Sequence, residues 1–185
     1  EIKKYFGAHV TCDHLIGRHA DSDEKCDPKK ACLVIKDLYT KWTEGHYKAS
    51  KSAEDTAEAL AWFKGGQDID CLYSDRAPEL KKAAKELKIR RHPKSLPAIH
   101  QMNGIAERCV QKVLNGTRLA LNNSGIPVSR WPLAMEHYCV VINAERDADG
   151  ISAHFRRFDR HFPGEMFPFG SLVYFLPHPD HINRY

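Results

Sequence analysis

The stretch that follows Asn103 and Gly104 constrains the fold most, because it predicts a long helix with two unlike faces. Asn-Gly is a turn signal, and neither Pro nor Gly interrupts the next residues up to Asn115. Glu107 is therefore predicted in the first turn of the helix. Side chains three and four residues apart form an apolar stripe, which predicts packing against a core, and a polar stripe. The apolar stripe is Ala106, Val110, Val113, Leu114, Thr117 and Leu121, and the polar stripe is Glu107, Gln111, Asn115, Arg118 and Asn122.

The first third of the chain predicts three strands. Residues 7–16 alternate in character, and His9, Thr11, Asp13 and Leu15 fall on one side of the predicted strand. The polar, turn-rich residues that follow predict a loop. The predicted segments are a strand at 7–16, a loop at 17–30, a strand at 31–39 and a strand at 42–49.

Helices and strands alternate in the prediction for the next part of the chain. A serine cap and an early acid open the first helix, a Gly-Gly pair ends it, and Pro78 opens the second helix. Pro93 and Pro97 mark a mobile connection into the Glu107 helix. The predicted elements are a helix that opens within 50–54 and ends at 65, a strand at 68–75, a helix at 78–87, a short strand at 88–94, the Glu107 helix and a helix at 129–146.

Composition is that of an ordinary globular protein. The 185 residues are 42% hydrophobic and 28% charged, which is enough for one domain with a small appendage. No apolar run approaches the length of a membrane span, and the first residues lack a signal-peptide layout, so no membrane partner is expected. Six scattered cysteines favour reduced, buried thiols in an intracellular protein.

Positive charge is concentrated in one window. Residues 85–118 contain eight Lys or Arg and two acids, a net +6, whereas the whole chain carries +4. A basic surface beside an acidic site suits a polyanionic substrate. A solvated charged helix end would give the same pattern.

Three short segments resemble the catalytic core of retroviral and retrotransposon (copia-like) integrases, which belong to the DDE superfamily. The segment QMNGIAER at 101–108 resembles the family's NG-(V/I)-A-E-R motif and contains Glu107. Asp13 lies within HVTCDHL at 9–15, and Asp75 ends IDCLYSD at 69–75, as the family's strand ends in SD. The resemblance covers roughly residues 7–147. It implies an RNase H-like α/β fold, in which a mixed five-stranded sheet is flanked by helices and the first and fourth strands are parallel neighbours.

The same resemblance implies a two-metal active site. Asp13, Asp75 and Glu107 would bind two Mg²⁺ or Mn²⁺ ions, with Asp13 bridging both. The implied reactions are trimming of the 3′ end of element DNA by water and joining of that end to target DNA. The implied partners are element and target DNA and further copies of the chain, at least as a dimer, in the nucleus if the host is eukaryotic. The candidate DNA-binding residues are Asn103, Arg108, Gln111, Lys112 and Arg118.

Other interpretations remain open at this point. Glu107 alone could be a surface acid that stabilises a helix start. An RNase H-type nuclease would take its next acid from the first helix, at Glu54 or Glu58. A domesticated, non-catalytic DNA-binding or assembly module is a third possibility, because Arg76-Ala77 replaces the family's usual residues after the second aspartate.

Two further interpretations concern zinc and the end of the chain. The spacing of His14, His19, Cys26 and Cys32 fits no standard zinc finger well, which disfavours structural zinc. Residues 1–147 are predicted as the catalytic core. Residues 148–185 are predicted as a short β-containing extension with a turn and strand at 167–175. This segment resembles the one that follows the core in copia-like retrotransposon polyproteins, where a small β-rich region begins.

Overall fold

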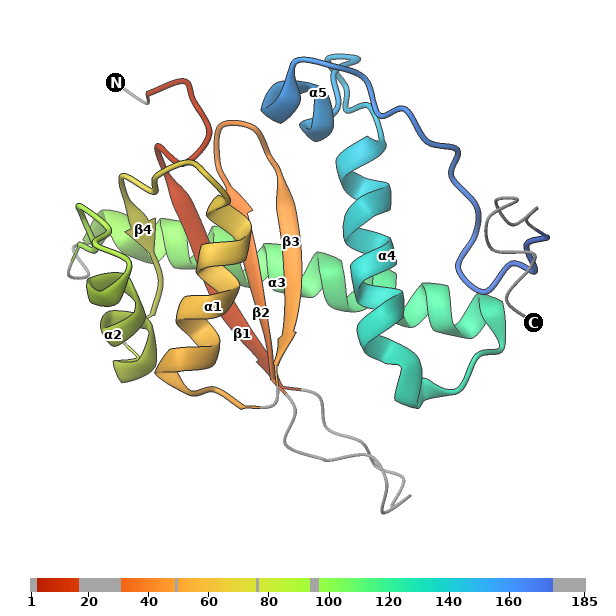
Figure 1. The fold of residues 1–185 in the computed structure, drawn as a ribbon, viewed down its shortest axis with the longest axis horizontal. Coiled ribbons are helices and arrows are strands. Elements are labelled where there is room, and N and C mark those ends of the chain that lie inside the picture. Colours follow the sequence, from red (N-terminus) through yellow and green to blue (C-terminus); the bar gives the residue numbers. More distant parts are fainter. Residues whose placement is uncertain (1–2, 17–30, 49, 76, 94–96, 175–185) are drawn as a thin grey trace, which may run out of the picture.

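A four-stranded mixed sheet lies at the centre of the molecule (Figure 1). The computed structural model describes residues 3–16, 31–48, 50–75, 77–93 and 97–174, without the side chains of 16 and 97–103. The strand order is β3-β2-β1-β4; β1 pairs antiparallel with β2 and parallel with β4, and β2 pairs antiparallel with β3. The strands are β1 (Val10–Ile16), β2 (Ala31–Asp37), β3 (Thr43–Lys48) and β4 (Leu72–Tyr73).

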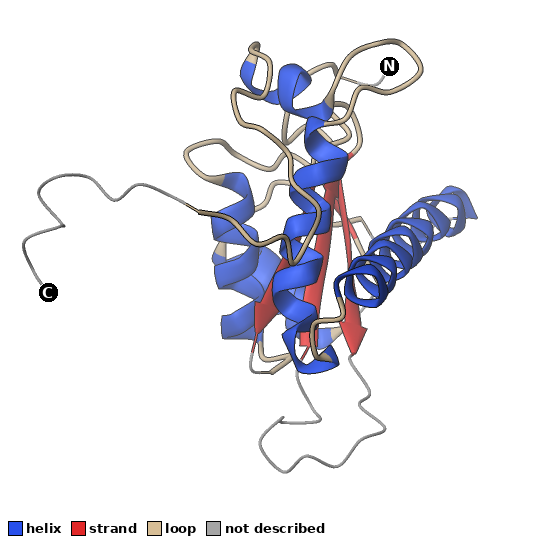
Figure 2. Ribbon diagram, turned by 90° about the vertical axis from the view of Figure 1, so that its right-hand side faces the viewer, coloured by secondary structure: helices blue, strands red, loops and turns tan. Residues whose placement is uncertain are grey.

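Helices cover both faces of this sheet. In Figure 1, α1 lies in front of the strands and α3 behind them, and Figure 2 shows α3 standing apart on its own side. α3 contacts β1 and β2, and α4 contacts β3. The helices are α1 (Ala53–Lys64), α2 (Pro78–Glu86), α3 (Pro97–Ser124), the 3₁₀ turn η1 (Val128–Arg130), α4 (Trp131–Ala144) and α5 (Ala153–Phe158).

Two apolar clusters, one on each face of the sheet, form the core. On β2, Leu33 and Ile35 join the cluster of α1 and α2, whereas Cys32 and Val34 join that of α3 and α4. This division follows from the two-residue period of a strand, which turns alternate side chains to opposite faces. The central strand is consequently apolar on both sides, as the run at residues 31–39 predicts.

Local signals fix the ends of α1 and α2 as predicted. The Ser52 side chain accepts a hydrogen bond from the Asp55 amide at 3.0 Å, and Gly65 ends α1 with a φ of 56°. Pro78 occupies the first turn of α2. The predicted loop at 17–30 lies outside the described residues.

The predicted fifth strand is wrong for the described residues: residues 88–93 contribute one isolated bridge, Cys71 with Arg91. The predicted strand at 68–75 is likewise reduced to β4 and that bridge. Two backbone hydrogen bonds join the segments, from Leu72 N to Arg91 O and from Arg91 N to Asp70 O. The ladder ends there because Pro93 has no amide hydrogen to extend it.

The predicted start of the long helix is also wrong. α3 begins at Pro97, so Asn103 and Gly104 lie inside the helix and Glu107 lies in its third turn. Pro favours the first helical position, and the buried stripe of α3 outweighs the cost of its two internal glycines, Gly104 and Gly116. Glu107 therefore lies too far from the helix start to gain from the helix dipole.

The strand predicted at 167–175 is absent from the described residues 167–174. This segment instead lies against helices: His137 Nε2 is 2.9 Å from the Phe167 carbonyl oxygen, and Phe169 packs on the cluster of α3 and α4. A strand needs an unpaired strand edge, and helices do not offer one. α5 was not predicted, and the domain boundary at 147 stays a prediction.

Several buried groups agree with the sequence analysis. The thiols of Cys12, Cys32, Cys71, Cys109 and Cys139 are free and buried, and Cys26 lies outside the described residues.

None of the described helices combines the length and the apolar character needed to cross a membrane.

Candidate active site

The pairing of β1 with β4 brings Asp13 and Asp75 to the same end of the sheet. Val10 pairs with Leu72 and Thr11 with Tyr73 in parallel register. Continued by two residues, this register sets Asp13 opposite Asp75. Residues 62 positions apart in the chain are thus neighbours, because parallel strands run in the same direction from paired starting points.

Asp13 faces the side of the sheet that α3 covers. On β1, Val10 and Cys12 belong to the cluster of α1 and α2, whereas Leu15 packs on the cluster of α3 and α4. Asp13 shares the face of Leu15 by strand alternation. Glu107 lies on α3, which contacts both β1 and β4. The fold therefore brings Glu107 towards the two aspartates from a third element.

The carboxylates of Asp75 and Glu107 both act on Asp13. Burial of Asp13 is the main cause that raises its pKa, and the negative charges of Asp75 and Glu107 raise it further. A hydrogen bond from the His14 amide at 2.7 Å and the charge of Lys51 oppose this rise. Because these interactions fall off with distance, the three carboxylates lie in one electrostatic neighbourhood.

The three side chains nevertheless do not converge on a single point. Among the described residues, no group of three His, Cys, Asp or Glu side chains is arranged to hold a metal ion. Asp13 Oδ1 accepts from the His14 amide and Asp75 Oδ1 from the Ala77 amide, at 2.7 and 3.2 Å. Asp13 is half-buried, whereas Asp75 and Glu107 are exposed and can rotate without breaking core packing.

A serine–histidine contact that was not predicted lies beside Asp75. Ser74 Oγ lies 2.8 Å from His92 Nε2 and donates to the Asp75 carbonyl oxygen at 2.9 Å. Burial lowers the pKa of His92, as does the charge of Lys81, and the Asp75 carboxylate opposes both. The single bridge between Cys71 and Arg91 brings this histidine beside β4, and no local sequence pattern predicts that bridge.

Lys51 was missed for a similar reason. Its charge lowers the pKa of Asp13, although it lies in the polar segment before α1. The sequence offers no periodicity there, so its place beside the carboxylates depends on how α1 packs.

The predicted division of α3 into two faces is confirmed. The polar stripe is exposed, while the apolar stripe is buried apart from the half-buried Leu114. The candidate DNA-binding residues Arg108, Gln111, Lys112 and Arg118 are all exposed. Asn103 lies within the helix, but its side chain is outside the described residues. α3 thus presents acidic and basic groups on one continuous surface.

A comparison of the chain with models of protein families and a comparison with curated proteins each found no match.

The alternative acids on α1 form ion pairs with lysines, and two of the candidate zinc ligands lie on opposite faces of the sheet. Glu54 pairs with Lys82 and Glu58 with Lys48, each at 2.7 Å. His14 lies 4.0 Å from Glu79 of α2, on the face opposite to Cys32. His14 and Cys32 therefore cannot bind one ion, and His19 and Cys26 lie outside the described residues.

Proposed function

We propose that this chain is a metal-dependent DNA integrase or transposase of the polynucleotidyl transferase class, built on an RNase H-like fold. The supporting observation is that β1 and β4 pair in parallel register, which brings Asp13 and Asp75 to one end of the sheet, while α3, which carries Glu107, contacts both strands. Three acids from distant parts of a chain rarely share one electrostatic neighbourhood without a cation to balance them. The strand order β3-β2-β1-β4 and helices on both faces fit the proposed fold.

The donor set fits hard divalent cations. Three carboxylates offer only oxygen ligands, which suit Mg²⁺ or Mn²⁺ rather than zinc. The repulsion that raises the pKa of Asp13 would become attraction to a cation. The exposed side chains of Asp75 and Glu107 can turn towards Asp13, which the sheet holds in place. Two ions held by these three residues would activate a water or a 3′-hydroxyl and stabilise the leaving 3′-oxygen.

The remaining residues would bind and orient DNA. Arg108, Lys112 and Arg118 are exposed on the same helix as Glu107 and can neutralise phosphates beside the reacting bond. Gln111 lies one turn after Glu107 and can donate to a base edge or a phosphate. The His14 amide holds the Asp13 carboxylate in one orientation. Joining two DNA ends to one target also calls for at least two copies of the chain.

A non-catalytic DNA-binding or assembly module is the second candidate. The observation that favours it is the absence, among the described residues, of an acid group arranged to hold a metal. Such a module would bind DNA in a salt-dependent manner without joining strands in Mn²⁺. An RNase H-type nuclease is less favoured, because α1, which carries Glu54 and Glu58, packs on the face of the sheet opposite to the one that Asp13 faces.

The test is strand transfer of a short DNA duplex in Mn²⁺. We expect Glu107→Gln to lower the rate by roughly 100-fold or more, since it removes a metal ligand. Glu86→Gln, an exposed acid on α2, serves as the matched control and should retain the wild-type rate.

Two outcomes would contradict the proposal. Wild-type protein that binds the duplex but joins no strands would favour the assembly module. Activity lost in Glu58→Gln and kept in Glu107→Gln would favour the nuclease.

A further inference from the structure

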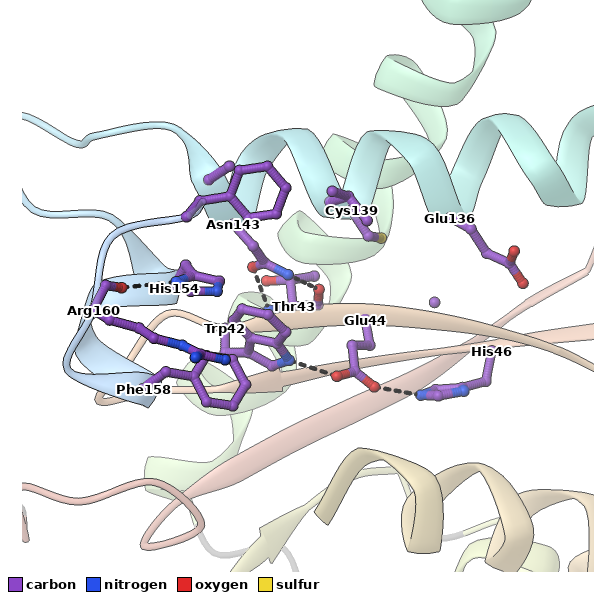
Figure 3. A pocket seen from close by; sticks show the side chains of 14 residues that line it. Trp42, Thr43, Glu44, His46, Glu136, Cys139, Asn143, His154, Phe158 and Arg160 are labelled. Atoms are coloured by element: carbon purple, nitrogen blue, oxygen red, sulfur yellow. Dashed lines mark hydrogen bonds and ion pairs between the residues drawn. The ribbon is translucent and has the colours of Figure 1, made fainter. Parts of the chain in front are cut away.

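A cavity of about 450 Å³ lies at the other edge of the sheet from the candidate active site. It is bounded by β3, α4, α5 and the residues that follow α5 (Figure 3). β3 is the edge strand opposite to β4, so β2 and β1 separate this cavity from Asp75. Its volume falls within the range of small-molecule sites.

Aromatic side chains form one end of the cavity. Trp42, His154, Phe158 and Phe162 all line it. Trp42 meets Phe158 edge to face with ring centroids 5.2 Å apart, and His154 meets Phe162 in the same way at 5.5 Å. Paired rings hold each other in fixed orientations, so they present a rigid wall to a planar ligand.

Most polar groups around the cavity are already satisfied within the protein. Glu44 accepts from Trp42 Nε1 and lies within 2.8 Å of His46 and 3.1 Å of Arg157. The Asn143 amide binds the backbone of Thr43 through both its oxygen and its nitrogen. Burial raises the pKa of Cys139 to about 12, so this thiol is neutral near pH 7. Because these groups already have partners within the protein, they would contribute little to the binding of a ligand.

Two charged groups that line the cavity remain free. Within the described part of the chain, neither the Arg160 guanidinium nor the Glu136 carboxylate takes part in an ion pair or a side-chain hydrogen bond. Figure 3 shows Arg160 at the end that holds the aromatic rings and Glu136 at the other end. The free charge beside the aromatic wall is therefore positive.

We propose that this cavity binds a small planar aromatic molecule that carries one anionic group. The ring would pack against Trp42 and Phe158, and the anion would pair with Arg160. This site uses none of the residues assigned to DNA or metal ions. The inference therefore stands whether or not the chain joins DNA strands.

The test uses 2-naphthoate, with neutral 2-naphthamide and cationic 2-naphthylmethylamine as matched probes. Binding to the full chain is followed by NMR through the indole N–H signals of its three tryptophans. We expect 2-naphthoate to bind most tightly and to shift the Trp42 signal, while the 70% exposed Trp62 stays unchanged. The buried Trp131 signal reports that each variant is folded.

Substitution at Arg160 separates charge recognition from apolar binding. Arg160→Gln should weaken 2-naphthoate by about three- to fivefold, the size expected of an exposed ion pair, and leave 2-naphthamide within about twofold. Arg130→Gln, an exposed arginine on η1 outside the cavity, should change neither.

Three results would overturn the inference. The first is that no probe shifts the Trp42 signal. The second is that 2-naphthylmethylamine binds most tightly of the three probes. The third is that Arg160→Gln and Arg130→Gln change the affinity for 2-naphthoate by the same factor.

Discussion

Arg157 combines an ion pair with several aromatic contacts in one side chain. Its Nη1 lies 3.1 Å from Glu44, and its Nη2 donates to the Phe63 carbonyl at 2.9 Å. The guanidinium lies 4.0 Å from the centre of the Phe6 ring and 4.7 Å from that of Trp42. This residue of α5 thus joins the C-terminal part of the chain to the core.

We expect Arg157→Ala to lower the free energy of unfolding by about 3 kcal/mol, because it leaves Glu44 without its cation in a largely buried position. Urea unfolding of both proteins measures the difference. Lys82→Ala removes a far more exposed pair and should leave the midpoint almost unchanged. Equal effects of the two substitutions would contradict this account of Arg157.

Ionisation of Asp13 is expected to lower the free energy of unfolding. Its pKa in the folded protein is raised by burial and by the two other carboxylates. As pH rises from the ordinary aspartate pKa through the raised value, ionisation becomes harder in the folded state than in the unfolded chain. Stability is therefore lost over that interval.

Asp13→Asn should accordingly unfold at a higher temperature than wild type at about pH 7 without divalent ions, and the difference should shrink towards about pH 4. Thermal unfolding at the two pH values measures it. Asp68→Asn, at a side chain that is 92% exposed, is the control and should show little change. A lower unfolding temperature of Asp13→Asn at neutral pH would count against repulsion at this site.

At the level of elements, α3 and α4 approach each other at a glycine. A Cβ added at Gly116 would lie 2.1 Å from the Tyr138 ring, which is closer than atoms can approach. The pairing of these helices thus depends on one missing side chain. Gly104, also within α3, has no described atom within 4 Å of such a Cβ.

Gly116→Ala should therefore lower the free energy of unfolding by about 1–3 kcal/mol through overpacking. Gly104→Ala should raise it by up to about 1 kcal/mol through helix propensity. Chemical denaturation of the two variants provides a matched comparison within one helix. Stabilisation by both substitutions would show that α4 can shift away from α3 at little cost.

At the scale of the whole molecule, the candidate DNA-binding groups of α3 and Asp13 share one face of the sheet. The exposed basic groups of α3 lie on the side that Asp13 faces, whereas α1 and α2 cover the opposite side. Under the proposed function, DNA would approach the α3 side, where the exposed Arg108, Lys112 and Arg118 can neutralise phosphates.

Lys112→Gln and Arg118→Gln should each reduce the slope of log K against log salt by about 1 for binding to a DNA duplex. Fluorescence anisotropy at several salt concentrations measures the slope. Lys82→Gln, exposed on α2 and outside the basic window at 85–118, should leave it unchanged. If Lys112→Gln and Arg118→Gln both kept the wild-type slope, the DNA-binding surface would lie elsewhere.

The sequence by itself determined the order of the first strands and helices, the two faces of α3 and the ends of α1. These features depend on local rules: side-chain period, caps and Gly or Pro at element ends. The same rules predicted a first-turn position for Glu107 and a fifth strand, and both predictions were wrong. The pairing at Arg91 depends on a distant segment, and the start of α3 depends on Pro97 together with the burial of the helix's apolar stripe.

The resemblance implied that the first and fourth strands are parallel neighbours, and the pairing of β1 with β4 confirms this prediction. The residues taken in order carry no such signal, so apart from the resemblance the assembly of the candidate site was decided by the tertiary structure. The parallel register of β1 and β4 sets Asp13 opposite Asp75, and the packing of α3 brings Glu107 near. Pairing between distant segments has no local signal, because it depends on backbone hydrogen bonds and core contacts that form only in the folded chain. For the same reason, His92 and Lys51 beside the carboxylates, and the cavity at β3, could not be read from the residues in order.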